Sequence, residues 1–130
     1  MLKYLNELNQ SKIIIHPLFI KDIENLLKRD LRGQEKEFWK LFLRQVSFID
    51  QFPVQDLYRY DHNEKLKYNN QDIYSLHLQT KVFNLRILAE PRSETIVLLV
   101  MFNEKSGKRR TNYSYQLKKL GKRLEEMNCA

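Results

Sequence analysis

The stretch "DIYSLHLQTKVFNLRIL", Asp72 to Leu88, decides the fold class. Its apolar side chains alternate with polar ones at a period of two, which is the pattern of strands that bury one face. The polar series consists of Ser75, His77, Gln79, Asn84 and Arg86. The apolar series consists of Ile73 or Tyr74, Leu76, Leu78, Phe83, Leu85 and Ile87. Two neighbouring strands of an antiparallel sheet are therefore expected.

A third strand is expected in "TIVLLVMF", Thr95 to Phe102. This segment is apolar on both faces, which is typical of a strand in the middle of a sheet or covered on both sides. The intervening "EPRSE", Glu90 to Glu94, has the proline and polar residues of a turn. The three strands are predicted to form a meander.

Two helices are predicted ahead of the sheet. The first runs from Leu18 to about Leu31, with apolar residues at helical spacing and Gly33 as a stop signal. The second runs from Glu35 to Asp50 and ends before Phe52-Pro53. Aromatic residues of the second helix, such as Trp39, have apolar neighbours, so they are expected in the core rather than around a ligand.

Short segments complete the N-terminal half. "KIIIHP", Lys12 to Pro17, is β-branched and predicts a short strand, and Leu2, Leu5 and Leu8 precede it at helical spacing. Residues 54–71 are polar and rich in asparagine and aspartate, and no helix or strand is predicted there.

A terminal helix is predicted from one apolar stripe. Its members are four and three residues apart and are Tyr113, Leu117, Leu120, Leu124 and Met127. Gly121 lies within this helix and weakens it slightly.

These elements predict an α+β fold in a single domain of residues 1–130. A strand and two helices would pack on a small antiparallel meander, and a C-terminal helix would close the fold. The helices are expected to cover one face of the sheet and to leave the other face polar. The loop after Phe102 would lie over one end of that polar face.

The charge is concentrated near the C-terminus. Residues 1–75 hold 12 basic and 11 acidic side chains, whereas residues 76–130 hold 11 basic and 5 acidic ones, a difference of +6. Between Lys105 and Arg123 there are eight basic residues and no acidic one, namely Lys105, Lys108, Arg109, Arg110, Lys118, Lys119, Lys122 and Arg123. Such a run is often a solvated helix face, but the lack of counter-charges favours an acidic partner such as nucleic acid.

Cysteine content, hydropathy and sequence motifs indicate the compartment and the kind of chemistry to expect. Cys129 is the only cysteine, so no internal disulfide is expected, and we predict a cytoplasmic protein. No apolar stretch is long enough for a membrane helix, and Lys3 and Glu7 interrupt any signal-peptide core. No P-loop, zinc-ligand spacing or nucleophile motif is found, so neither a metal nor another cofactor is expected.

Cations, tyrosines and a histidine around a sheet suit RNA cleavage. In that reaction the substrate's own 2′-hydroxyl is the nucleophile, so a protein needs to position it, stabilise charge on phosphorus and move protons. Arg86 projects from the polar face and suits a phosphate, unless it merely pairs with Glu90 or Glu94. His77 is a candidate base, although such a histidine is more often packing.

Two tyrosines follow the basic loop. Tyr113 and Tyr115 are candidates to stack on a base or to donate a proton to the leaving oxygen. Tyr113 continues the apolar stripe of the terminal helix, so its ring is expected in the core and only its hydroxyl would be available. Tyr115 is expected to be the more exposed of the two.

Residues 73–127 resemble the RelE/ParE toxin superfamily, most closely its HigB-like, phage-derived branch. Leu85-Arg86 stands in place of the family's Tyr-Arg pair, Phe102 in place of the phenylalanine that ends the apolar strand, and Lys105 and Lys108 in place of the loop lysines. Two positions depart from the family pattern. Gln79 replaces an arginine, and Thr111-Asn112 stands in place of a proline and is expected to cap the helix.

The resemblance implies a RelE-like fold and a toxin that cuts mRNA on the ribosome. It also implies a small antitoxin that wraps the toxin and covers its basic site. In this interpretation Arg86, Lys105 and Lys108 stabilise the phosphorane. Tyr115 or Tyr113 orients the RNA or protonates the leaving oxygen, and His77 assists as a base. Arg109, Arg110, Lys118, Lys119 and Lys122 would hold the RNA.

Two other functions stay open at this point. A non-catalytic module could use the same cationic helix to bind RNA, DNA or the ribosome. The superfamily also contains gyrase poisons, and a fold alone does not distinguish these from nucleases.

Overall fold

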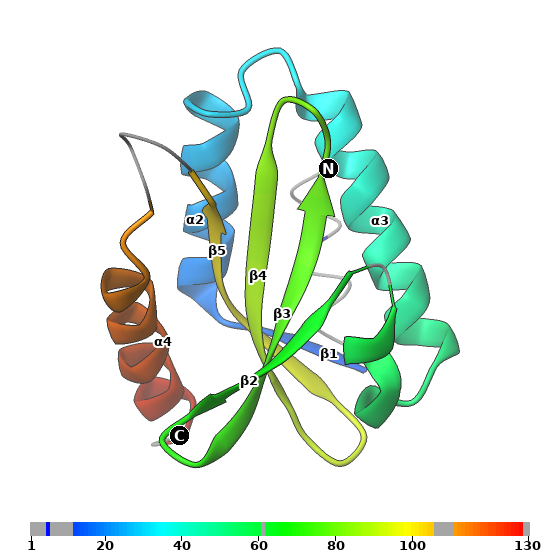
Figure 1. Ribbon diagram of the computed structural model, residues 1–130, viewed down its shortest axis with the longest axis vertical. Coiled ribbons are helices and arrows are strands. Elements are labelled where there is room, and N and C mark those ends of the chain that lie inside the picture. The colour runs from blue at the N-terminus through cyan, green and yellow to red at the C-terminus, as the bar shows by residue number, and fades with distance from the viewer. Residues whose placement is uncertain (1–4, 6–11, 61, 106–110, 129–130) are drawn as a thin grey trace.

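The computed structural model describes residues 5, 12–60, 62–105 and 111–128 (Figure 1). In chain order the elements are β1 (Ile13–Ile15), α2 (Pro17–Lys28), α3 (Glu35–Gln51), the 3-10 helix η1 (Val54–Arg59), β2 (Glu64–Tyr68), β3 (Gln71–Gln79), β4 (Asn84–Pro91), β5 (Ile96–Asn103) and α4 (Tyr113–Asn128). The predicted α+β class is confirmed, including the C-terminal helix.

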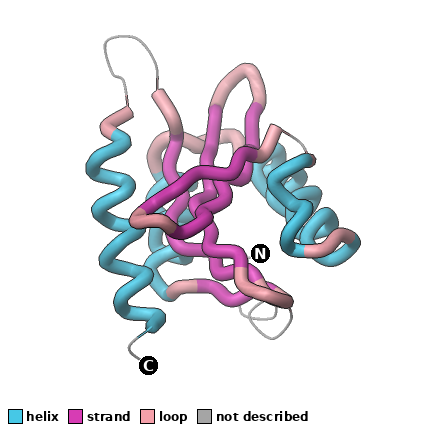
Figure 2. Tube along the Cα trace, turned by 60° about the horizontal axis from the view of Figure 1, so that its bottom comes forward, coloured by secondary structure: helices cyan, strands magenta, loops and turns pink. Residues whose placement is uncertain are grey.

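One mixed sheet organises the fold, with strand order β1-β5-β4-β3-β2. The β3-β4-β5 meander is antiparallel as predicted, whereas β1 pairs in parallel with β5, Ile14 opposite Val97. Helices α2 and α3 cover one face, here called the α3 face, and α4 covers part of the other, here called the α4 face (Figure 2).

The expectation of a polar, uncovered second face is wrong. Apolar residues of α4, chiefly Leu120 and Leu124, pack there on residues such as Leu88 and Val100. The apolar residues of α4 do not cover the end of the α4 face near Phe102, where polar side chains lie. The sequence signal for this cover was the two-sided apolar pattern of β5, which needs a layer on each side.

Strand β2 was missed because it is short and lies in a polar segment, although its Leu66 and Tyr68 alternate with Lys65 and Lys67. It is one of the two edge strands of the sheet, and its lysines, Lys65 and Lys67, are exposed as is common on edge strands. Asn69 and Asn70 link it to β3, and both have positive φ values, 50° and 63°. Asparagine tolerates this conformation better than most residues, so the Asn-Asn pair was the readable hairpin signal.

Element boundaries differ modestly from prediction. Helix α3 matches the expected range to within a residue, but α2 ends at Lys28 rather than near Leu31. Gly33 then takes the left-handed conformation that suits glycine, with φ of 82°. Of the three N-terminal leucines, Leu5 is buried, while Leu2 and Leu8 lie outside the described residues.

Side chains cap both edges of the sheet where strand pairing stops. Beyond β1, the edge of β5 is capped by Asp22, which accepts from the Met101 amide at 3.0 Å, and by Arg123, which donates to the Leu99 carbonyl at 2.6 Å. Beyond β2, the amide of His77 donates to the Asn63 side chain at 2.9 Å. Buried backbone groups are thereby paired, and α4 is tied to α2.

The part of the chain that the structure describes contains no helix with the length and hydrophobicity needed to cross a membrane.

Candidate functional site

Four polar side chains meet where the α4 face is left uncovered by apolar residues. Pairing aligns His77 of β3 with Arg86 of β4 and Arg86 with Phe102 of β5, so these three side chains share that face. Glu104 follows β5 and Tyr113 begins α4. We call His77, Arg86, Glu104 and Tyr113 the Arg86 cluster.

Arg86 is the centre of this cluster. Its Nε donates to the Glu104 Oε2 at 2.7 Å, and its Nη1 lies 2.5 Å from the His77 Nδ1. The side chains of Arg86 and Glu104 are 14% and 26% exposed, so the pair is shielded but reachable from solvent. The alternative partners from the sequence, Glu90 and Glu94, are not the ones used.

Tyr113 closes the cluster from the helix side. Its hydroxyl is hydrogen-bonded to the Glu104 carboxylate, and its ring packs edge-on against Phe102 with centroids 5.6 Å apart. At 40% exposure the ring is not in the core, and the hydroxyl is already engaged. The expectation of a buried ring with an available hydroxyl is therefore wrong. Helix α4 starts here because the Asn112 side chain accepts from the Tyr115 amide at 3.2 Å, which confirms the predicted cap.

The cluster has a defined charge state near neutral pH. Burial and the positive charge of Arg86 lower the pKa of His77 to about 4, so His77 is neutral. Burial and the hydrogen bond to Glu104 raise the pKa of Tyr113 to about 12. Burial favours the neutral form of Glu104, but the hydrogen bonds from Tyr113 and Arg86 outweigh it and lower its pKa.

His77 is held in one tautomer. A guanidinium can only donate, so the Nδ1 of His77 accepts from Arg86 and the proton lies on Nε2. That Nε2 is buried and has no hydrogen-bond partner among the described residues, and the same holds for Oδ1 of nearby Asn84. The lone pair that a general base needs is engaged, so this geometry does not favour the predicted base role.

The described cations are partly neutralised by aspartates from α2 and the turn after it. Lys105 lies 3.5 Å from Asp30, and Lys119 lies 3.4 Å from Asp22. Arg123 is buried in a 2.6 Å pair with Asp22. The run of eight cations has no acidic residue along the sequence. In the fold, however, an aspartate lies beside three of its described members.

The remaining predicted contacts lie on α4 or outside the described residues. Lys118 and Lys122 are exposed on α4. Tyr115 is 58% exposed, as predicted, and the Lys119 ammonium lies 5.7 Å from the centroid of its ring. The loop cations Lys108, Arg109 and Arg110 lie outside the described residues.

Sequence reasoning missed Glu104, Asp22 and Asn84. Glu104 is two residues after Phe102, so the period of the strand already placed both on one face. Asp22 had a weaker signal, as an acidic residue next to Ile23 in the apolar stripe of α2, and its partner is 101 residues away. No local pattern predicts such a distant pair.

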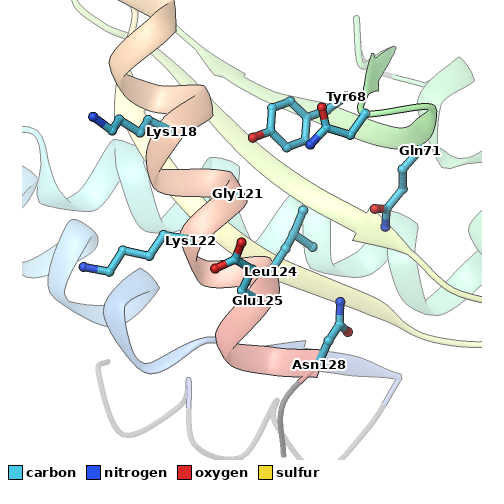
Figure 3. Close-up of a pocket in the computed structure, with 9 residues that line it drawn as sticks. Tyr68, Gln71, Lys118, Gly121, Lys122, Leu124, Glu125 and Asn128 are labelled. Carbon is cyan, nitrogen blue, oxygen red and sulfur yellow. The ribbon is translucent and has the colours of Figure 1, made fainter.

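One cavity lies apart from the Arg86 cluster. It measures about 360 Å³ and lies between the β2-β3 turn and the C-terminal half of α4. Lys118 and Lys122 are among the residues that line it, and Figure 3 shows their side chains extending to the side of α4 away from Tyr68 and Gln71. We place the candidate site at the Arg86 cluster because its polar groups converge there and two of them have strongly shifted pKa values.

The described residues offer no group of three or more His, Cys, Asp or Glu side chains that could hold a metal ion. Comparisons with protein-family models, with curated proteins and with solved structures found no match to this chain.

Proposed function

We propose that this chain is a toxin of the RelE/ParE type, of the HigB-like branch, which cuts mRNA on the ribosome and is inhibited by a small antitoxin. The observation that carries the proposal is the Arg86 cluster, in which a shielded guanidinium and a tyrosine hydroxyl meet at one carboxylate. The order of strand, two helices, antiparallel meander and closing helix also agrees with a RelE-like fold. A cytoplasmic location follows from this role, because the ribosome is the site of action.

The proposed chemistry uses the 2′-hydroxyl of RNA as the nucleophile. Arg86 and Lys105 would stabilise the negative charge that develops on the phosphorane, since a guanidinium fork suits two phosphate oxygens. Tyr115 has the exposure to stack on a base, and the loop cations would hold the backbone. Attack by the 2′-oxygen on phosphorus breaks the bond to the 5′-oxygen. The 2′-hydroxyl loses its proton to solvent and the 5′-oxygen gains one, so the products are a 2′,3′-cyclic phosphate and a 5′-hydroxyl.

A non-catalytic module for nucleic acid is the second candidate. It is favoured by Lys118 and Lys122, which are exposed on α4 and do not belong to the Arg86 cluster. In that case affinity would depend on the sum of the charges, and no single residue would abolish activity. The gyrase-directed alternative predicts growth arrest with intact mRNA.

The test is a brief induction in bacteria followed by mapping of mRNA 5′ ends before growth stops. Wild type should produce new ends inside translated codons, and Arg86→Ala should not. Arg59→Ala is the matched control, because it removes an exposed arginine of η1 and should cut like wild type. Arg86→Lys, which keeps the charge but loses the fork, should retain only a small part of the cleavage. Intact mRNA with wild type would overturn the nuclease proposal, and cleavage by Arg86→Ala would remove Arg86 from the site.

A further inference from the structure

The Glu104 carboxylate sits among donors that would equally suit a phosphate. Its Oε2 accepts from the Arg86 Nε at 2.7 Å and from the Asn84 Nδ2 at 3.4 Å. The Tyr113 hydroxyl is hydrogen-bonded to the same carboxylate. A guanidinium, an amide and a phenol converging on one anionic group form a built oxyanion site.

The side chain of Glu104 can leave this site without unfolding the sheet. Its backbone amide donates to the Asn84 carbonyl at 2.7 Å and fixes the main chain independently of the carboxylate. Glu104 lies beyond the last residue of β5, and Tyr113 beside it is 40% exposed. A rotation of the Glu104 side chain toward solvent therefore opens the donors to a ligand.

We propose that Glu104 is an internal substitute for phosphate, which occupies an oxyanion site made by Arg86, Asn84 and Tyr113 until a backbone phosphate of RNA displaces it. The proposal rests on the proposed function for the identity of the ligand as RNA. The oxyanion site itself rests only on the contacts described above. The free protein then holds Arg86 in a neutralised state, and substrate binding exchanges one anion for another.

The exchange predicts that removing the Glu104 charge strengthens phosphate binding. Glu104→Gln keeps the size of the side chain but gives up the ionic contact with Arg86, so a phosphate no longer competes with a carboxylate. We expect the affinity for inorganic phosphate to rise about tenfold, which corresponds to about 1.4 kcal/mol. The Nε-H resonance of Arg86, followed by NMR during a phosphate titration, reports on the site directly.

The matched control is Glu24→Gln on α2, which removes one negative charge from a partly exposed ion pair with Lys21. It should bind phosphate like wild type. Glu104→Asp keeps the charge but shortens the reach, so it should show an intermediate gain. A thermal melt of each variant establishes that it is folded.

Three outcomes decide the proposal. A gain in Glu104→Gln that disappears when Arg86→Gln is added supports it. A titration of Glu104→Gln that matches Glu24→Gln overturns it, as does an Arg86 resonance that phosphate does not shift. The titration involves no RNA, so its result is separable from the mRNA mapping. If Glu104→Gln binds phosphate more tightly but wild type does not cleave mRNA, the oxyanion site is supported and the nuclease function is rejected. If wild type cleaves mRNA but Glu104→Gln shows no gain in phosphate binding, only the displacement of Glu104 by phosphate is rejected.

Discussion

Replacing Asp22 by asparagine should strongly destabilise the protein. The carboxylate of Asp22 accepts from the Met101 amide and from both terminal nitrogens of Arg123, the latter at 2.6 and 3.1 Å. The side chains of Asp22 and Arg123 are only 8% and 7% exposed, so solvent screens their interaction little. Asparagine keeps the shape but leaves the Arg123 charge buried without a counter-ion.

The expected magnitude follows from the loss of one partner in a buried pair. Such changes cost about 3–5 kcal/mol, and the remaining hydrogen bond from Arg123 to the Leu99 carbonyl places the estimate at about 3 kcal/mol. For a chain of this length each kcal/mol lowers the melting temperature by about 4 °C, so a decrease of about 12 °C is expected. Helix α4 should loosen first, because this pair ties it to α2.

Urea unfolding followed by circular dichroism measures the change, with an unaltered m-value as the sign that the unfolded state is the same. A double-mutant cycle with Asp22→Leu and Arg123→Met separates the pair from its surroundings. The double variant should be less destabilised than the sum of the single ones. It should still lose about 1–3 kcal/mol for each edge group of β5 that is left unpaired. A cost below about 1 kcal/mol for Asp22→Asn would refute the reasoning, because that is the value of an exposed pair.

Other predictions concern the Arg86 cluster and the packing of α4. The pKa of His77 is lowered to about 4, so the folded protein binds its proton less readily than the unfolded chain does. Its stabilising contribution is complete above the unfolded pKa of 6.5 and is lost as the pH falls through about 4, and a His77→Gln variant should show a flatter pH dependence of unfolding over that range. Titration of the His77 imidazole near pH 6.5, followed by NMR, would contradict this. Tyr113→Phe should raise the pKa of Glu104, because the hydrogen bond from the phenol is lost, and an unchanged carboxyl titration would speak against the contact. A Cβ on Gly121 would overlap the Tyr68 hydroxyl, so Gly121→Ala should gain its helix propensity of about 0.8 kcal/mol only in a Tyr68→Leu background. Equal gains in both backgrounds would contradict that packing.

The alternating strands and amphipathic helices were predictable because burial of one face imposes a period on the sequence. The meander of β3, β4 and β5 and the helix α3 illustrate this, since nearly all of their apolar residues fall in one of two core clusters and Leu43 is the exposed exception in α3. Strand β2 shows the limit. It is held mainly by backbone pairing with β3 and by its asparagine turn, and its apolar pattern is limited to Leu66 and Tyr68.

The site was only partly predictable for a related reason. The strand period placed His77 and Arg86 on one face, and their pairing in the register agrees with it. The partners of the cations were less predictable. Glu104 continues the period of β5, whereas Asp22 comes from a different helix, 101 residues from Arg123. Ion pairs depend on three-dimensional proximity, and the charge count of a linear segment does not report it.

The most direct test of the central claim is the chemistry of the cut ends in a purified translation reaction. With wild-type protein, a translated message should yield fragments with a 2′,3′-cyclic or 3′-phosphate and a 5′-hydroxyl. A message with a single 2′-deoxy nucleotide at the mapped position should stay intact there, because the nucleophile has been removed. Cleavage of the 2′-deoxy message at that position, or no cleavage of either message, would contradict the account.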